Sequence, residues 1–330
     1  MIESPYLLFL GDTSDPSYAK TAFGLRDWAQ ERCAGQLRIG PGVDLGLMDL
    51  RVDQAVAKGI RTLVIGVAPP GGALPSAWIP VIVEALDGGL DVASGLHTSL
   101  SEIEEIRVAA ERNAATLHDV RVPATSYPVA SGRRRSGKRL LTVGTDCAIG
   151  KKYTALAINR KMQEAGLDST FRATGQTGIL IAGAGVPIDA VVADFLSGAA
   201  ETLSPDNDPG HWDVIEGQGC LFHPAYAGVT TGLFHGSQPD VLVLCDEVDK
   251  NEIYEYSGYP IPPLEEVMTA YLDVARLTNA DVRFAGVAFN TSKLGEVDAR
   301  KWLDQKRSEL KLPCTDPYRF GVEELMMQIR

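Results

Sequence analysis

The sequence predicts an α/β protein with two domains, a Rossmann-like parallel-sheet domain followed by a P-loop NTPase-like α/β domain. Three observations predict this fold class. Short apolar runs alternate with amphipathic stretches in both halves of the chain, the pattern of parallel sheets that carry helices on their faces. A glycine-bounded loop that ends in Gly-Lys follows one of these runs. The chain has 330 residues, more than the roughly 250–300 that one core usually organises.

The N-terminal domain is expected to cover residues 1–130. Its apolar runs predict buried strands at residues 6–10, 62–67 and 91–94. Its amphipathic stretches predict helices at residues 17–32, 76–86 and 100–113. The loop after the second strand is expected to be formed by Pro69, Pro70, Gly71 and Gly72. No G-x-G-x-x-G occurs in this half, so no dinucleotide-binding fingerprint is inferred.

A polar, charged run at residues 131–139, S-G-R-R-R-S-G-K-R, predicts the linker between the domains. The alternation of strands and helices then resumes over residues 140–330. The expected strands are 140–143, 170–173, 213–215, 241–244 and 283–288. The expected helices are 151–165, 189–202, 264–277 and 297–310. This second alternation predicts a second parallel sheet.

The composition limits the class of function. A net charge of −12 argues against nucleic acid as a partner but leaves room for a small phosphorylated ligand in a local pocket. The N-terminus shows neither a signal peptide nor a membrane span, and the five cysteines form no C-x-x-C pair. We therefore expect a cytoplasmic protein that acts on a small-molecule substrate, away from membranes, and assembles as a homo-oligomer.

The strongest local signal is an apolar strand that runs into a glycine-bounded loop and then a helix. In such a loop the backbone N–H groups and the helix N-terminus attract phosphate, and a lysine reaches its outer oxygens. The expected cofactor-binding residues are Gly144, Thr145, Asp146, Cys147, Ala148, Ile149, Gly150, Lys151, Lys152, Tyr153 and Thr154. The alternative is a tight strand-to-helix turn that binds no ligand.

This loop departs from the usual P-loop pattern in two ways. Five residues rather than four separate its two glycines, and Lys152 stands where a Ser or Thr usually follows the lysine. The nearest hydroxyl is that of Thr154. Because the usual hydroxyl binds Mg²⁺, the departure counts against a metal-dependent ATP site.

Two carboxylates are expected at strand ends, where open α/β sheets bind ligands. Glu216 follows the strand in W-D-V-I-E-G-Q-G, and Asp246 ends V-L-V-L-C-D, a segment similar to a Walker B strand. Each has a functional interpretation, as a catalytic residue or, for Glu216, a metal ligand. Each also has a structural alternative, a loop hydrogen bond for Glu216 and a helix cap for Asp246.

Further candidates lie near these strand ends. His223 is a candidate base, although a lone histidine is more often a packed residue. A turn after the second strand of this half is rich in donors, so the expected substrate-binding residues are Arg172, Thr174, Gln176 and Thr177. Cys147 and Cys220 are either nucleophiles or, as we favour, small buried thiols.

The segments G-T-D-C-A-I-G-K and V-I-E-G-Q-G resemble dethiobiotin synthetase and related P-loop enzymes, which share the five-residue loop spacing. The resemblance implies that Glu216 binds Mg²⁺ and that Asn290 contacts the adenine. It covers mainly residues 140–154 and 212–220. It also implies the alternative activity, an ATP-dependent kinase or carboxylate-activating ligase.

A longer resemblance links nearly the whole chain to the DgcN-type family, long described as a domain of unknown function. It is carried by the loop segment and by R-A-T-G-Q-T-G-I-L-I, D-N-D-P-G-H-W-D-V-I-E-G-Q-G, P-Y-L-L-F-L-G-D and D-V-A-S-G-L-H. The resemblance implies an acyltransferase that acetylates D-glutamate, or a related amino acid, from acetyl-CoA. Coenzyme A carries a diphosphate, so the loop suits it as well as ATP with Mg²⁺. A nucleotide-binding regulator without turnover is a third alternative.

The sequence departs from this family at one segment. Members carry L-C-H-E with an arginine a few residues later, whereas this chain has L-C-D-E-V-D-K. Asp246 therefore stands at the histidine position and Lys250 near the arginine. If that histidine is catalytic, this chain has changed the step; if it is structural, little changes.

Overall fold

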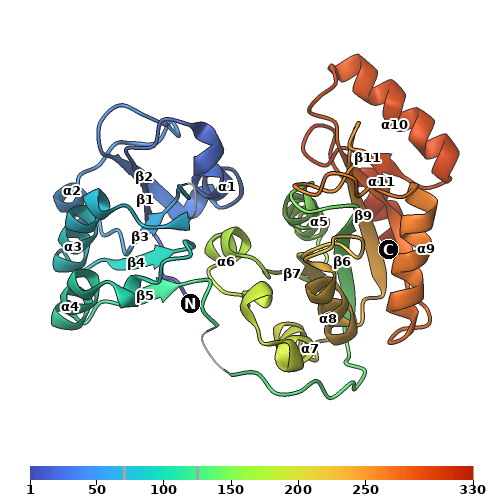
Figure 1. Cartoon of the computed structure of the whole chain (residues 1–330), viewed down its shortest axis with the longest axis horizontal. Coiled ribbons are helices and arrows are strands. Elements are labelled where there is room, and N and C mark those ends of the chain that lie inside the picture. The colour runs from blue at the N-terminus through green and yellow to red at the C-terminus, as the bar shows by residue number, and fades with distance from the viewer. Residues whose placement is uncertain (70–71, 124–125, 330) are drawn as a thin grey trace. The chain divides into compact units, whose positions relative to one another are not determined.

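The computed structural model of the chain describes residues 1–69, 72–123 and 126–329, which form two compact units (Figure 1). The first unit comprises Met1–Ala124 and Gly175–Ala190, and the second comprises Thr125–Thr174 and Val191–Arg330. Residues 175–190, which the expected boundaries placed inside the 140–330 domain, thus belong to the first unit. Of the expected loop at 69–72, Pro70 and Gly71 lie outside the described residues.

The first unit is built on a five-stranded, all-parallel sheet in the order β2-β1-β3-β4-β5. Its inner strand Y-L-L-F-L-G, second in this order, is apolar and wholly buried, as a strand covered on both faces must be. The strands are β1 (Tyr6–Gly11), β2 (Cys33–Arg38), β3 (Thr62–Ile65), β4 (Asp91–Ser94) and β5 (Leu117–Asp119).

Figure 1 shows three helices of the first unit side by side along this sheet, namely α2 (Val52–Ala57), α3 (Ile79–Asp87) and α4 (Glu104–Asn113). The chain reverses its direction across the sheet at β1, so right-handed crossovers place α1 (Lys20–Trp28) on the opposite face. There α1 contacts α6 (Gln176–Ala182). The single helix expected at residues 17–32 is split, because Ala29 leaves the helical conformation at φ −141°.

The second unit contains a six-stranded, all-parallel sheet in the order β11-β10-β9-β6-β8-β7. Its central strand begins two residues earlier than the expected strand, inside the expected linker. The strands are β6 (Lys138–Gly144), β7 (Ser169–Arg172), β8 (Trp212–Ile215), β9 (Val241–Glu247), β10 (Arg283–Asn290) and β11 (Cys314–Thr315).

The helices of the second unit lie on both faces of this sheet. The chain moves from β6 toward the β7 edge and afterwards back toward β11, so right-handed crossovers place α5 on one face and α7, α8 and α9 on the other. The reversal makes β6 the topological switch point. The helices are α5 (Lys151–Glu164), α7 (Ala193–Leu203), α8 (Ala227–Ser237), α9 (Leu264–Arg276), α10 (Glu296–Leu310) and α11 (Glu323–Ile329).

The strands and helices expected from sequence are present, and the alternating α/β class is confirmed. The donor-rich turn expected at residues 174–178 is instead largely the start of the helix α6, and the helix expected from residue 189 begins at Ala193. Several short elements were not expected: β2, α2, β5, α8, β11 and α11. All five cysteines are free thiols. Within the described ranges, every helix is too short or too polar to cross a lipid bilayer.

Candidate functional site

The glycine-bounded loop follows β6 at the switch point of the second sheet, the place where open α/β sheets bind ligands. β9 and β8 are the neighbours of β6 on its two sides. Asp246 lies near the end of β9, and Glu216 directly follows β8. The two carboxylates expected from sequence therefore flank the loop from opposite sides.

The backbone of the loop is shaped for an anion. Ala148 has φ 56° and Gly150 has φ 110°, and left-handed residues within a turn are what form concave arrays of N–H groups. The N–H of Thr145 is taken by the carbonyl of Cys245 at 3.1 Å. The N–H groups of Ala148, Ile149 and Gly150 have no hydrogen-bond partner among the described residues.

Lys151 is the first residue of α5, and only 7% of it is exposed. Its Nζ donates a hydrogen bond to the main-chain carbonyl of Asp146, 2.6 Å away. In the described part of the chain, no carboxylate lies within 4.0 Å of this Nζ. A buried ammonium without a counterion is costly, so this position favours an anionic ligand.

Asp146 connects the loop to the segment that follows β9. This carboxylate is fully buried. Its Oδ1 accepts from the N–H of Cys147 at 2.6 Å, and its Oδ2 accepts from the N–H of Tyr254 at 2.7 Å and from Lys250 Nζ at 3.1 Å. Asp146 is thus a structural anchor of the loop, and Lys250 is a second lysine at the site. The sequence marked Lys250 only as a departure from the family.

Asp246 holds the first turn of the loop. Thr145 Oγ1 donates a hydrogen bond to its Oδ1 at 2.5 Å. Burial raises the pKa of the Asp246 carboxyl to about 6. The expected helix-cap role is not observed, since the side chain binds the loop instead.

Glu216 is 4% exposed and is bonded to Thr174 at two points. The N–H of Thr174 donates to Glu216 Oε2 at 2.9 Å, and Thr174 Oγ1 donates to the Glu216 carbonyl at 2.7 Å. The next residue, Gly217, lies so close to β6 that an added Cβ would be 1.7 Å from the carbonyl oxygen of Thr142. The structure therefore brings Glu216 and Thr174 together beside the loop.

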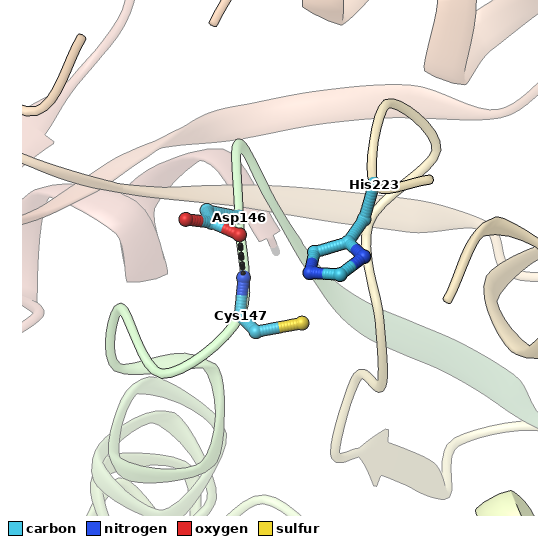
Figure 2. A group of neighbouring side chains, drawn as sticks. All are labelled: Asp146, Cys147 and His223. Atoms are coloured by element: carbon cyan, nitrogen blue, oxygen red, sulfur yellow. Dashed lines mark hydrogen bonds between the residues drawn. The ribbon is translucent and has the colours of Figure 1, made fainter. Parts of the chain in front are cut away.

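His223 lies beside the loop, on the side toward which the side chain of Cys147 points (Figure 2). Figure 2 shows its ring directed toward these two residues. A ring nitrogen of His223, the Cys147 Sγ and an Asp146 carboxylate oxygen all lie within 4.8 Å of one another. The ring is 2% exposed and packs against Tyr226 and Tyr256, with ring centroids 4.5 and 5.0 Å away.

The cysteines at the site are not activated as nucleophiles. Burial raises the pKa of both the Cys147 and the Cys220 thiol, which disfavours the reactive thiolate. Cys220 Sγ donates to the carbonyl of Thr145 at 3.0 Å. These contacts agree with the interpretation of both as small packed thiols.

The other expected residues have different surroundings. Arg172 Nε is ion-paired to Asp213 at 2.6 Å, so the structure gives this guanidinium a structural partner. Gln176 and Thr177 belong to the first unit, where Gln176 accepts from Arg121 and Thr177 shares a hydrogen bond with Thr21. Asn290 ends β10, and its Oδ1 accepts from the N–H of Ser292 at 3.1 Å.

The residues after Lys151 do not fit a magnesium site. Thr154 is buried and its Oγ1 accepts from Cys245 Sγ at 3.5 Å, so its hydroxyl faces the sheet. Lys152 lies over the ring of Tyr153 at 4.5 Å and brings a further positive charge. The donor set, rich in N–H groups and ammonium groups, suits a phosphate ligand better than a divalent cation.

Comparison with known proteins gives matches along the whole chain. A family model described as a P-loop domain of unknown function (DUF1611_C) matches residues 128–326, and a Rossmann-like one (DUF1611_N) matches residues 41–123. A protein of Tritonibacter scottomollicae named D-glutamate N-acetyltransferase is 50% identical over 327 residues, 99% of this chain and 98% of that protein. A protein of Pseudoalteromonas sp. with the same name is 43% identical over 329 residues, 99% of each chain.

A solved structure shows the same architecture. The crystal structure of a DUF1611 family protein from Anabaena variabilis aligns with a TM-score of 0.85 and 33% identity, over 99% of each chain. These matches confirm the family resemblance and the fold class expected from the motifs. The chain therefore belongs to the DUF1611 family, in which a Rossmann-like domain precedes a P-loop domain.

Proposed function

We propose that this chain is an acyltransferase that moves the acetyl group of acetyl-CoA to the amine of D-glutamate. The support for D-glutamate acetylation is the pair of full-length relatives that carry this name, at 50% and 43% identity. The support for the donor is local. Lys151 is a buried ammonium without a carboxylate partner in the described chain, at the mouth of a loop with three unbonded N–H groups.

The loop is proposed to hold the diphosphate of coenzyme A. The N–H groups of Ala148, Ile149 and Gly150 would donate to phosphate oxygens, and the N-terminus of α5 adds roughly half a positive charge. Lys151 would exchange its carbonyl partner for a phosphate oxygen. Binding of coenzyme A does not require a protein hydroxyl that coordinates Mg²⁺. This agrees with Thr154, whose hydroxyl is buried and faces the sheet.

Acetyl transfer requires a neutral amine, so a base must take a proton from the ammonium of the amino acid. Glu216 is the proposed base, since Thr174 fixes one of its carboxylate oxygens at the edge of the loop. For the thioester to reach Glu216, the flexible pantetheine arm of the cofactor has to fold back over the loop. Asp246 is proposed to keep Thr145, and with it the loop, in place.

The test is a measurement of free thiol released from acetyl-CoA by the pure protein. We expect release with D-glutamate and much less with L-glutamate, and N-acetyl-D-glutamate should appear in equal amount. A parallel assay supplies ATP, Mg²⁺ and D-glutamate. ADP formation in that assay, with no thiol release in the first, would contradict the proposal and favour a ligase of the dethiobiotin synthetase type.

A further inference from the structure

The ring of His223 is held in one orientation by a specific hydrogen bond. Its Nδ1 accepts from the backbone N–H of Ala225, 3.2 Å away. Tyr226 and Tyr256 pack on the same ring, at 4.5 and 5.0 Å between ring centroids. Because a backbone N–H can only donate, Nδ1 must offer its lone pair.

This contact fixes the proton of the neutral ring. A neutral imidazole carries one N–H, and with Nδ1 acting as acceptor that proton is on Nε2. The Nε2 of His223 is therefore a hydrogen-bond donor. A general base would need a free lone pair at that nitrogen, which this tautomer does not have.

The free side of the ring faces the phosphate loop. Figure 2 shows the ring edge away from the backbone of His223 directed toward Asp146 and the Sγ of Cys147. These groups lie within 4.8 Å of one another, and His223 is 2% exposed. Among the described residues, Nε2 has no hydrogen-bond partner. A donor without a protein partner, on a residue that is 2% exposed and aimed at a loop shaped for an anion, indicates an oxygen ligand.

We propose that His223 binds a diphosphate oxygen of coenzyme A as a neutral Nε2–H donor, and that it is not the catalytic base. This inference rests on the proposed function only for the identity of the ligand. A metal at the Asp146, Cys147 and His223 cluster is disfavoured, because Lys250 lies 3.1 Å from the Asp146 carboxylate and a cation would be repelled. Lys151 and Lys250 would then lie beside the same diphosphate as His223, while Asp146 anchors the loop.

The experiment compares three substitutions at one position. His223→Gln places an amide N–H near the position of Nε2, His223→Asn places it near Nδ1, and His223→Ala removes both. Affinity is measured by calorimetry for coenzyme A and for S-acetylpantetheine, which lacks the diphosphate. A hydrogen bond to a charged group predicts that coenzyme A binds about 10- to 100-fold more weakly to the Ala and Asn variants. The Gln variant should bind it nearly as the wild type does, and all should bind S-acetylpantetheine equally.

A matched control is His211→Gln, which alters another buried histidine, held by Asp168 and Asp213 just before β8 begins. It should lower thermal stability and leave the affinity for coenzyme A unchanged. Circular dichroism tests whether each variant is folded. If the Ala variant is not folded, the comparison is made between the Gln and Asn variants.

Two results would overturn the inference. In the first, the Gln and Ala variants both bind coenzyme A as the wild type does, but both fail to release thiol from acetyl-CoA. That result would identify His223 as the base. The other is wild-type affinity in all three variants. Failure of the proposed function is distinct, because it appears as wild-type protein that binds coenzyme A without releasing thiol from acetyl-CoA.

Discussion

Thr145 Oγ1 donates a hydrogen bond to Asp246 Oδ1 over 2.5 Å, which ties the first turn of the loop to the end of β9. The pair is buried, and burial raises the pKa of the Asp246 carboxyl to about 6. Ionisation of the Asp246 carboxyl therefore lowers the free energy of unfolding of the chain.

Asp246→Asn is expected to stabilise the ligand-free protein at pH 7. The Asp246 carboxyl titrates near 3.8 when unfolded and near 6 when folded, so the folded chain binds the extra proton between these pH values. Wild-type stability therefore falls as pH rises through this window, by at most about 3 kcal/mol. Urea unfolding of both proteins at pH 4 and pH 7 measures their free energies of unfolding. These free energies should be close at pH 4 and differ at pH 7. An equal difference at both pH values would contradict the raised pKa of Asp246.

Gly217→Ala is expected to destabilise the chain by about 1–3 kcal/mol, the usual cost of overpacking. The new Cβ would lie 1.7 Å from the backbone oxygen of Thr142 and 3.2 Å from Lys151 Cδ, so the segment after Glu216 must move. The control is Gly228→Ala in α8, where nothing lies within 4 Å of the new Cβ. This control should gain about 0.5–1 kcal/mol from the helix preference of alanine. Thermal unfolding that ranks the two variants alike would contradict this account.

Cys147→Ala is expected to keep most of the activity. Burial raises the pKa of the Cys147 thiol, and the Nε2 of His223, which carries the ring proton, offers no lone pair to accept the thiol proton. We expect kcat to change by less than about threefold, since no transition-state contact is removed. The check is steady-state kinetics together with mass spectrometry of the protein after incubation with acetyl-CoA alone. An acetylated Cys147 in the wild type would show that the acetyl group passes through the enzyme.

Glu216→Gln is expected to lower kcat by about 10²- to 10⁴-fold, the range over which general bases contribute. Gln keeps the size of the side chain and an oxygen for the Thr174 N–H, so the affinity for acetyl-CoA should be retained. Initial rates of thiol release and calorimetry separate the two quantities. A variant with normal kcat would place the base elsewhere.

The central strand, loop and helix of the second unit could be predicted because their signals are local. An apolar run, a glycine and a Gly-Lys pair stand next to one another in the sequence. α8 was missed because its three glycines resemble breakers. In the structure two of them, Gly232 and Gly236, allow close packing with α7, since a Cβ at Gly236 would lie 2.1 Å from the Ser197 carbonyl oxygen. β5 and β11 are two or three residues long and leave no periodicity to detect.

The sequence predicts those site residues that directly follow strands. It does not predict contacts between residues that lie far apart in the sequence. Glu216 and Asp246 flank the loop as their positions after parallel strands predict. The contact of Tyr254 with Asp146 joins residues 108 apart, and no local pattern encodes it. Arg172 looked like a carboxylate ligand, but the neighbouring strand supplies Asp213 as its partner. Long-range pairing of this kind decides the role of a charged residue.

Lys151 and the loop are proposed to bind the diphosphate of acetyl-CoA. The most direct test is the ratio of Kd values for S-acetylpantetheine and acetyl-CoA, measured by calorimetry in the wild type, in Lys151→Met and in the control Lys161→Met. Lys161 lies in the same helix, where it pairs with Glu323 at 2.9 Å. We expect Lys151→Met to lower this ratio by about 10- to 100-fold and the control to leave it unchanged. A ratio that is the same in all three proteins would show that the loop does not hold the diphosphate.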